Sequence, residues 1–310
     1  MSGMSSGVAR RISTIALNQE QGEQVVVAPC EGAGLGGRSL IVDAHLHLNN
    51  YHADDQAPTE THLQRLRDQM DKWAVDQAIV LTSYTVNQDR PSAARLLELI
   101  HPDPRLFVVE GLGVTGPAPV DWENVEARLR AGRTIGLKFY PGYEPAYPTD
   151  PRFLPGIELA GRYKVPIMIH CGDTYAPRAK LKYAQPIHVD DLAVDYPDVQ
   201  FIICHLGNPW FRETAEIIYK NENVHADIAG LVLEEFTAPM EAFMKEELRE
   251  VILYSGDPES LLFGTDWPLV RMGPYIRFVE QLGLEPEHRA KLLGENARRL
   301  FRLGARAAGD

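Results

Sequence analysis

The sequence predicts an α/β protein built as a (β/α)₈ TIM barrel, on three observations. From Leu40 onward, short apolar or β-branched runs alternate with longer amphipathic stretches, which is the pattern of βα units around a parallel sheet. Eight such runs are present, and their C-terminal ends lie about 23 to 38 residues apart, which suits one βα unit each. The first run is followed by HLHLNNYH, whereas an open doubly wound sheet would need a glycine-rich phosphate turn there.

Each element can be placed along the chain. Strands are predicted at residues 40–46, 78–83, 106–112, 135–140, 165–170, 199–205, 223–228 and 261–266. Helices are predicted at 61–75, 91–100, 120–131, 209–220, 239–254, 273–284 and 286–304, and the other connections leave room for one helix each. Residues 1–38 carry Gly, Ser and Gln without periodicity. We therefore expect a flexible N-terminal extension, with one short strand at 24–28, before a single catalytic domain at 39–310.

Composition narrows the class of partner. The formal net charge is −12 and no basic stripe is present, so a nucleic-acid partner is not expected. No apolar run approaches the roughly 18 to 20 residues of a membrane span, so no membrane partner is expected either. The three cysteines, Cys30, Cys171 and Cys204, form no CxxC pair and suit a reducing compartment. We expect a cytoplasmic protein that binds a small molecule, and the sequence also permits a homo-oligomer.

The segment DAHLH (43–47) is the strongest chemical signal. Side chains in a strand alternate with a period of two, so Asp43, His45 and His47 share one face. Two histidines at this spacing offer two nitrogen ligands to a borderline metal such as zinc. Asp43 is then placed to orient a ligand histidine.

Three further strand ends carry residues of the same kind. His170 ends VPIMIH, His205 ends VQFIICH and Asp266 ends LLFGTD. The C-terminal ends of the strands form the face on which barrel enzymes hold their catalytic groups. Singly, each of these residues reads as a core histidine or a capping aspartate, but together they predict a metal site. By alternation, Cys171 and Cys204 should point away from the lumen and serve only in packing.

Lys138 ends the fourth strand on the lumen face, and three interpretations remain open for it. A free ammonium beside a dication is electrostatically unfavourable. The lysine is carboxylated and bridges two metals, or it binds a substrate carboxylate, or it extends out of the barrel mouth into solvent.

Six segments resemble a known family, and they span residues 40 to about 301. They are DAHLH (43–47), GLKFYP (136–141), PIMIHCGDT (166–174), FIICHLGN (201–208), LLFGTDWP (261–268) and GENARRLF (294–301). The pattern resembles the amidohydrolase superfamily, and within it the amidohydrolase-related branch that includes aminocarboxymuconate-semialdehyde decarboxylase. The resemblance implies a distorted (β/α)₈ barrel and a metal-dependent enzyme.

The resemblance also implies roles for the matching residues. In mononuclear members the metal ligands would be His45, His47, His170 and Asp266. His205 would be a catalytic acid/base or substrate contact there, and a second-metal ligand in binuclear members. Lys138 occupies the place where binuclear relatives carry a carboxylated lysine, which the decarboxylase branch usually lacks. One divalent ion, most simply Zn²⁺, is therefore expected, with two ions and Mn²⁺ or Fe²⁺ as alternatives.

A hydrolase is the first functional hypothesis. A metal-activated water would cleave an amide, lactone or ester bond in a small, carboxylated substrate. Asp266 would take the proton and pass it to the leaving group, and His205 would stabilise the oxyanion. The alternative is a non-oxidative decarboxylase of a small unsaturated or aromatic acid, in which Asp266 or His205 delivers a proton to carbon. A barrel that only binds or assembles is a third hypothesis, which a full ligand set disfavours.

Four residues are candidates for substrate contact, and for each a purely structural role is the alternative. Arg178 would anchor an anionic substrate, or it belongs to a solvated basic loop. Tyr140 and Trp267 would form an aromatic rim, or they only pack the mouth. Lys138 is the fourth, as a cation for a carboxylate.

Overall fold

The computed structural model describes residues 38–51, 55, 57–232, 237–256 and 258–304. The chain divides into two compact units, residues 1–38 and 39–310. Arg38 alone is described in the first unit, so the expected extension and its strand at 24–28 lie outside the described residues. Within the described part, no helix is both long and apolar enough to cross a membrane.

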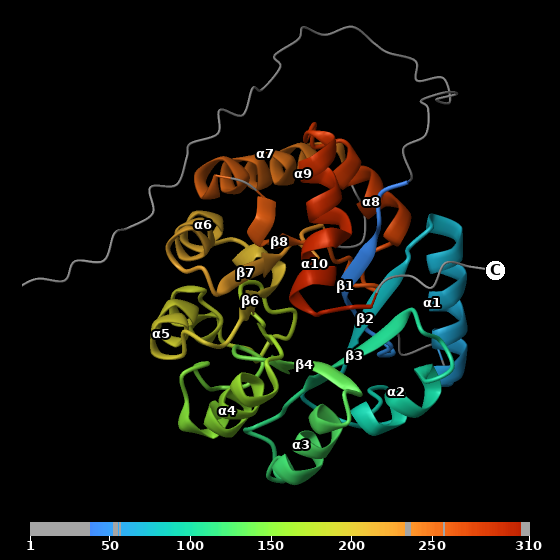
Figure 1. The fold of residues 1–310 in the computed structure, drawn as a ribbon, viewed down its shortest axis with the longest axis vertical. Helices are drawn as coiled ribbons and strands as arrows, with labels where there is room; N and C mark the ends of the chain where they lie inside the picture. Colours follow the sequence, from blue (N-terminus) through green and yellow to red (C-terminus); the bar gives the residue numbers. More distant parts are fainter. Residues whose placement is uncertain (1–37, 52–54, 56, 233–236, 257, 305–310) are drawn as a thin grey trace, which may run out of the picture. The chain divides into compact units, whose positions relative to one another are not determined.

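Eight parallel strands follow one another in sequence order in the second unit (Figure 1). They are β1 (Val42–Leu46), β2 (Gln77–Leu81), β3 (Leu106–Gly111), β4 (Thr134–Phe139), β5 (Ile167–Ile169), β6 (Phe201–Ile203), β7 (Val224–Asp227) and β8 (Leu261–Leu262). The sheet closes between β1 and the segment that follows β8, because the Ala44 N–H donates to the Phe263 carbonyl at 2.9 Å and the Asp266 N–H donates to the His45 carbonyl at 2.8 Å. The predicted (β/α)₈ barrel is confirmed, with all eight strands near their expected positions.

Helices follow the strands around the outside of the barrel (Figure 1). In the described residues they are α1 (Thr59–Trp73), α2 (Ala93–Ile100), α3 (Trp122–Arg130), α4 (Leu154–Tyr163), α5 (Ile187–Asp195), α6 (Phe211–Lys220), α7 (Ala238–Ser255), α8 (Met272–Glu280), α9 (Pro286–Ala290) and α10 (Asn296–Leu300). The single helix expected at 286–304 is instead α9 and α10 joined by a π-helical turn, Lys291–Glu295. That turn brings Gly294 against the backbone of Leu40, where an added Cβ would lie 2.5 Å from the carbonyl oxygen.

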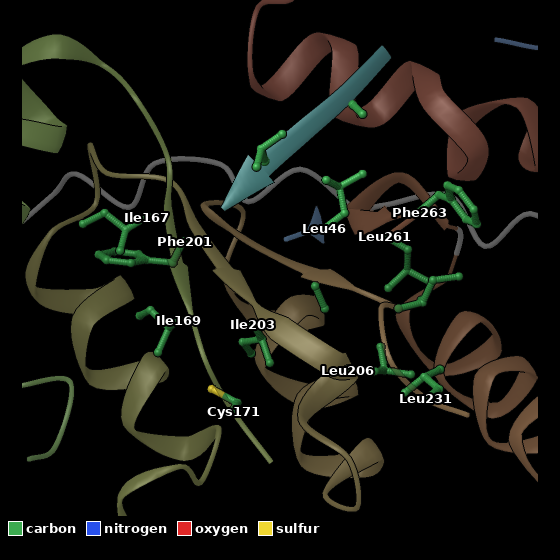
Figure 2. Packing of buried hydrophobic residues seen from close by; sticks show 14 of the residues in the cluster. Leu46, Ile167, Ile169, Cys171, Phe201, Ile203, Leu206, Leu231, Leu261 and Phe263 are labelled. Carbon is green, nitrogen blue, oxygen red and sulfur yellow. The ribbon is translucent and has the colours of Figure 1, made fainter. Parts of the chain in front are cut away.

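Strand alternation divides the buried apolar side chains into two clusters. The outer cluster lies between strands and helices, and Figure 2 shows Ile167, Ile169 and Cys171 of the β5 segment within it. The inner cluster is built from the alternate positions and fills the lumen below the site. Its members are the strand residues Val42, Ala44, Ile79, Leu81, Val109, Met168, Ile202 and Leu262, together with Cys204, which directly follows β6. Each buried Leu, Ile or Val contributes about 1.5 to 3 kcal/mol, so the lumen is a rigid floor for the residues above it.

The two buried cysteines lie on different sides of the sheet. Cys171 belongs to the outer cluster, as alternation predicts. Cys204 belongs to the inner cluster, so the expectation that it points away from the lumen is wrong. The reason is local: Ile203 is the outward residue of β6, and the chain turns at His205 into the left-handed region, with φ 57°. Both Cys204 and His205 can therefore face inward, which strict alternation does not allow.

Candidate metal centre

A cavity of about 440 Å³ lies at the C-terminal ends of the strands. Seven of the predicted site residues line it: His45, His47, Lys138, Tyr140, His170, His205 and Asp266. Two others do not. Arg178 is exposed in the loop after β5, and Trp267 is buried in the outer hydrophobic cluster. The sequence pattern is thus brought together in one cavity, except for these two candidates for substrate contact.

His45, His47 and Asp266 form a compact group of metal-binding atoms, all within 4.8 Å of one another. Asp266 Oδ1 lies 3.5 Å from His47 Nε2 and 4.0 Å from His45 Nε2. The same oxygen is buried without a hydrogen-bond partner. An unpartnered buried carboxylate oxygen is costly, so this atom calls for a cation or a donor that protein atoms do not supply.

Hydrogen bonds set which nitrogen of each ring keeps its lone pair. His47 Nδ1 is 2.9 Å from the Leu81 carbonyl oxygen, and His205 Nδ1 is 2.9 Å from the Ala229 carbonyl oxygen. A carbonyl oxygen only accepts, so both Nδ1 atoms carry the hydrogen and both Nε2 atoms are free to bind a metal. His47 Nε2 is the atom that faces Asp266.

His45 is oriented by a carboxylate that the sequence did not single out. Asp227, at the end of β7, accepts from His45 Nδ1 at 2.9 Å, from the His205 N–H at 2.8 Å and from the Ala229 N–H at 3.1 Å. Its oxygens are therefore occupied, although it also forms a close donor group with His45 and His205. Asp227 holds the ring of His45, a common arrangement behind metal-binding histidines.

Asp43, expected in that orienting role, has a different one. Its carboxylate accepts from the Thr265 N–H at 3.0 Å, the Thr265 hydroxyl at 2.6 Å and the His45 backbone N–H at 3.2 Å. It thus joins β1 to the segment after β8, just below the two histidines. Burial raises the pKa of Asp43 to about 7.

His170 lies in the same cavity but outside the compact donor groups found among the described residues. Its Nε2 donates to the Asp173 carbonyl oxygen at 3.0 Å, so Nδ1 keeps the lone pair. Its ring centre is 5.0 Å from that of His205 and 4.7 Å from that of Tyr143. The structure places His170 beside His205 as a further imidazole of the site.

The backbone is strained where it carries the site. His205 has φ 57° and Asp266 has φ 63°, both in the left-handed region that non-glycine residues rarely adopt. Gly264 allows the segment after β8 to approach β1, because an added Cβ would lie 2.8 Å from the Cβ of His45. Such strain is kept where surrounding structure enforces it, typically at functional sites.

Burial keeps the histidines neutral. It lowers the pKa of His47 to about 4 and that of His205 to about 3, and it holds the pKa of His45 and His170 well below 6.5. The positive charge of Lys138 adds to each of these shifts. Neutral imidazoles at physiological pH have the lone pairs that a metal needs.

Burial has the opposite effect on Asp266, whose pKa it raises to about 8. The charge of Lys138 opposes this rise, while Asp227 and Asp43 add to it. A nearby dication would favour the ionised carboxylate and so reverse the shift. The unpartnered oxygen, the two facing imidazoles and the raised pKa together fit a divalent metal at His45, His47 and Asp266.

Lys138 is almost fully buried, at 1% exposure, and lies in the cavity. Its Nζ is 2.6 Å from Cys204 Sγ and 5.4 Å from the centre of the Tyr140 ring. Among the described residues it forms no ion pair with a carboxylate. It therefore does not extend into solvent, the third of the interpretations made from the sequence.

Comparison with known proteins identifies the family of the chain. The family model described as Amidohydrolase matches residues 42–303. The chain belongs to the amidohydrolase family. Among curated proteins, none matches this chain at a significant level.

Solved structures share its fold at low sequence identity. A protein from Pseudomonas putida that carries the provisional name 2-pyrone-4,6-dicarboxylic acid hydrolase matches with TM-score 0.65 and 19% identity, over 86% of this chain and 99% of its own. 5-Carboxyvanillate decarboxylase LigW from Sphingomonas paucimobilis matches with TM-score 0.61 and 17% identity, over 86% and 100%. A dihydroxybenzoic acid decarboxylase from Polaromonas sp. JS666, which holds manganese and 2-nitroresorcinol, matches with TM-score 0.61 and 15% identity, over 86% and 98%.

Asp227 and Arg90 are among the residues of this site that the sequence analysis did not identify. Asp227 is the last residue of β7, and His170 and His205 lie just beyond the ends of β5 and β6, so the same topological rule could have found it. Arg90 lines the cavity from the loop after β2, and a lone arginine in a loop has no periodic signal.

Proposed function

We propose that the protein is a metal-dependent hydrolase that cleaves an amide, lactone or ester bond in a small, carboxylated substrate. One observation carries the proposal: a buried carboxylate oxygen of Asp266, without a hydrogen-bond partner, faces the free nitrogens of His45 and His47 inside the cavity. Hydrolysis needs a base of this kind beside an activated water, and here the base is shielded from bulk solvent.

The residues fit one divalent ion, with His45, His47 and Asp266 as its core and His170 as the further ligand expected from the family pattern. When bound, the ion would polarise water and the substrate carbonyl, and Zn²⁺ or Mn²⁺ suits this nitrogen and oxygen set. A second ion is less well provided for. Each candidate group contains His45, whose Nδ1 already donates to Asp227, so only its Nε2 is available.

Asp266 and His205 divide the proton chemistry in this proposal. Asp266 accepts the proton released when water attacks and returns it to the leaving group. His205, neutral and with its Nε2 free, receives a hydrogen bond from the substrate or from water at that atom. Lys138, which forms no ion pair with a described carboxylate, stabilises negative charge on the substrate, the second of the three interpretations made from the sequence.

Decarboxylation is the second candidate, and a specific observation favours it. The unpartnered Asp266 oxygen in the cavity can take the proton of the substrate acid and give it to the carbon atom that loses CO₂. In this reaction the water is not consumed. The two candidates use the same residues and differ in whether Asp266 returns the proton to a leaving group or gives it to carbon.

The test is to follow oxygen and carbon in one experiment. The protein, loaded in turn with Zn²⁺ and Mn²⁺, is screened against small lactones, esters, amides and aromatic acids in ¹⁸O-labelled water. Hydrolysis predicts one ¹⁸O in the product and no CO₂, whereas CO₂ release without labelled oxygen in the product would overturn the hydrolase proposal. Asp266→Asn should abolish turnover, and Arg178→Ala, which lies outside the cavity, should keep it.

A further inference from the structure

We propose that Arg90 binds a carboxylate of the substrate at the rim of the cavity. The proposal rests on the proposed function only in taking this cavity as the substrate site. It replaces Arg178, which the sequence suggested for the same task but which is exposed and does not line the cavity.

Arg90 is a cation without an acidic partner in the part of the chain that the structure describes. It is half-buried and lines the cavity together with the metal-site histidines. No described carboxylate lies within 4.0 Å of its guanidinium, in contrast to Arg105, Arg128 and Arg152, which are each paired with one. A half-buried guanidinium whose charge is left uncompensated is the feature of a site that takes an anion.

The guanidinium is held in place by neutral groups. Its Nη1 donates to the hydroxyls of Ser83 at 3.0 Å and Thr85 at 3.3 Å, and its centre lies 5.8 Å from the centre of the Tyr84 ring. The backbone is fixed as well, because Asn87 and Arg90 exchange N–H to carbonyl bonds of 3.1 and 3.2 Å. These contacts use one of three guanidinium nitrogens, so the remaining N–H groups can receive a carboxylate in the bidentate mode.

An aromatic wall leads from Arg90 toward the metal centre. The rings of Tyr84 and Tyr143 are stacked, with centres 5.9 Å apart and planes 24° apart, and the Tyr143 ring is 4.7 Å from that of His170. Aromatic rings that line a cavity favour an aromatic or conjugated ligand, which packs against their faces and edges. The substrate class that fits is therefore a planar acid, an aromatic or conjugated ring that bears a carboxylate directed toward Arg90.

Lys138 does not take over this role. It lies nearly fully buried beside Cys204, whereas Arg90 belongs to the loop after β2 and is partly open to solvent. Lys138 therefore lies deep in the cavity, and Arg90 lies at its rim. A substrate bound at Arg90 would place its planar part along the tyrosines, with its far end toward the histidines.

Binding of a simple planar acid tests this without any turnover. Benzoate and its neutral counterpart benzamide are titrated calorimetrically into the metal-free protein, so that a metal–carboxylate contact does not contribute. Arg90→Met should weaken benzoate binding about 10- to 100-fold, the effect of losing a hydrogen bond to a charged group, and leave benzamide unchanged. Arg90→Lys, which keeps the positive charge but not the paired N–H groups of the guanidinium, should give an intermediate loss of benzoate affinity. The matched variant Arg178→Met should bind benzoate as tightly as the unaltered protein does.

The outcomes separate the two proposals. Equal benzoate affinity in Arg90→Met and the unaltered protein, equal losses in the Arg90 and Arg178 variants, or no benzoate binding by the unaltered protein would overturn the role of Arg90. If Arg90→Met does not fold, as judged by circular dichroism, Arg90→Lys carries the test alone. Failure of hydrolysis appears only in the labelled-water experiment and leaves the benzoate result standing.

Discussion

Replacing Asp227 by asparagine should weaken metal binding although Asp227 is not expected to touch the metal. In the native side chain, Oδ1 accepts from the backbone N–H groups of His205 and Ala229, and Oδ2 accepts from His45 Nδ1. The asparagine oxygen can keep both backbone bonds. Its NH₂ group then faces His45 Nδ1, and two donors repel unless His45 moves its hydrogen to Nε2. That shift removes the lone pair that faces Asp266.

The size of the effect follows from this change of tautomer. Loss of the partner that orients a metal-binding histidine costs 10- to 100-fold in metal affinity, or about 1.4 to 2.7 kcal/mol. The assay is a competition titration of the metal-free protein with Zn²⁺ against a chromophoric chelator at fixed pH. Thermal unfolding of the same samples reports whether the fold is kept.

Asp43 provides the matched control. It is as deeply buried as Asp227, but it contacts Thr265 and the backbone of His45, not an imidazole. Asp43→Asn should therefore lower stability while changing zinc affinity much less than Asp227→Asn does. Equal losses of zinc affinity in the two variants, or native affinity in Asp227→Asn, would refute the orienting role of Asp227.

Three further outcomes follow from the structure. In the metal-free protein the pKa of Asp266 is about 8 when the chain is folded and 3.8 when it is unfolded, so the contribution of Asp266 to the free energy of unfolding falls as pH rises between these values. Between pH 6.5 and 8 the unaltered protein should therefore lose about 1 to 2 kcal/mol of stability relative to Asp266→Asn. Urea denaturation at the two pH values measures this difference. Gly264→Ala should destabilise the protein by about 1 to 3 kcal/mol in the same assay and reduce zinc affinity, because the new methyl group would press on the Cβ of His45. Arg128→Ala leaves buried Glu110 without its ion-pair partner and should cost about 3 kcal/mol with unchanged zinc affinity, since this pair does not line the cavity.

The fold was predictable because parallel strands buried on both faces form short apolar runs, and the spacing of their ends sets the topology. The weakest match is β8, which the sequence extends to Asp266 but which ends at Leu262. Beyond Gly264 the chain pairs with β1 and then turns to φ 63° at Asp266. Propensity does not signal such a turn, because the surrounding contacts enforce it.

The site was predictable to the extent that it follows strand ends. His45, His47, His170, His205 and Asp266 meet in one cavity for that reason. Alternation could not give the direction of His205, whose left-handed backbone lets its side chain face inward beside that of Cys204. Counting back from His205 therefore misplaced Cys204, which follows the alternation of Ile202. Hydrogen-bond partners are also beyond the pattern, since the bond from His45 to Asp227 joins residues 182 positions apart.

The charges around the cavity are consistent with one ion and one anionic substrate. Of the three buried carboxyl groups near the histidines, Asp43 and Asp227 are satisfied by N–H and hydroxyl donors, and Asp266 alone has an unpartnered oxygen. A dication is therefore best placed at Asp266, because there it satisfies the carboxylate and meets neutral imidazoles. With the ion bound, Lys138 and Arg90 remain in the cavity without a described acidic partner, and the positive charge is in excess. An acidic substrate would neutralise that excess, so the features that favour a metal at Asp266 also favour a carboxylate beside it.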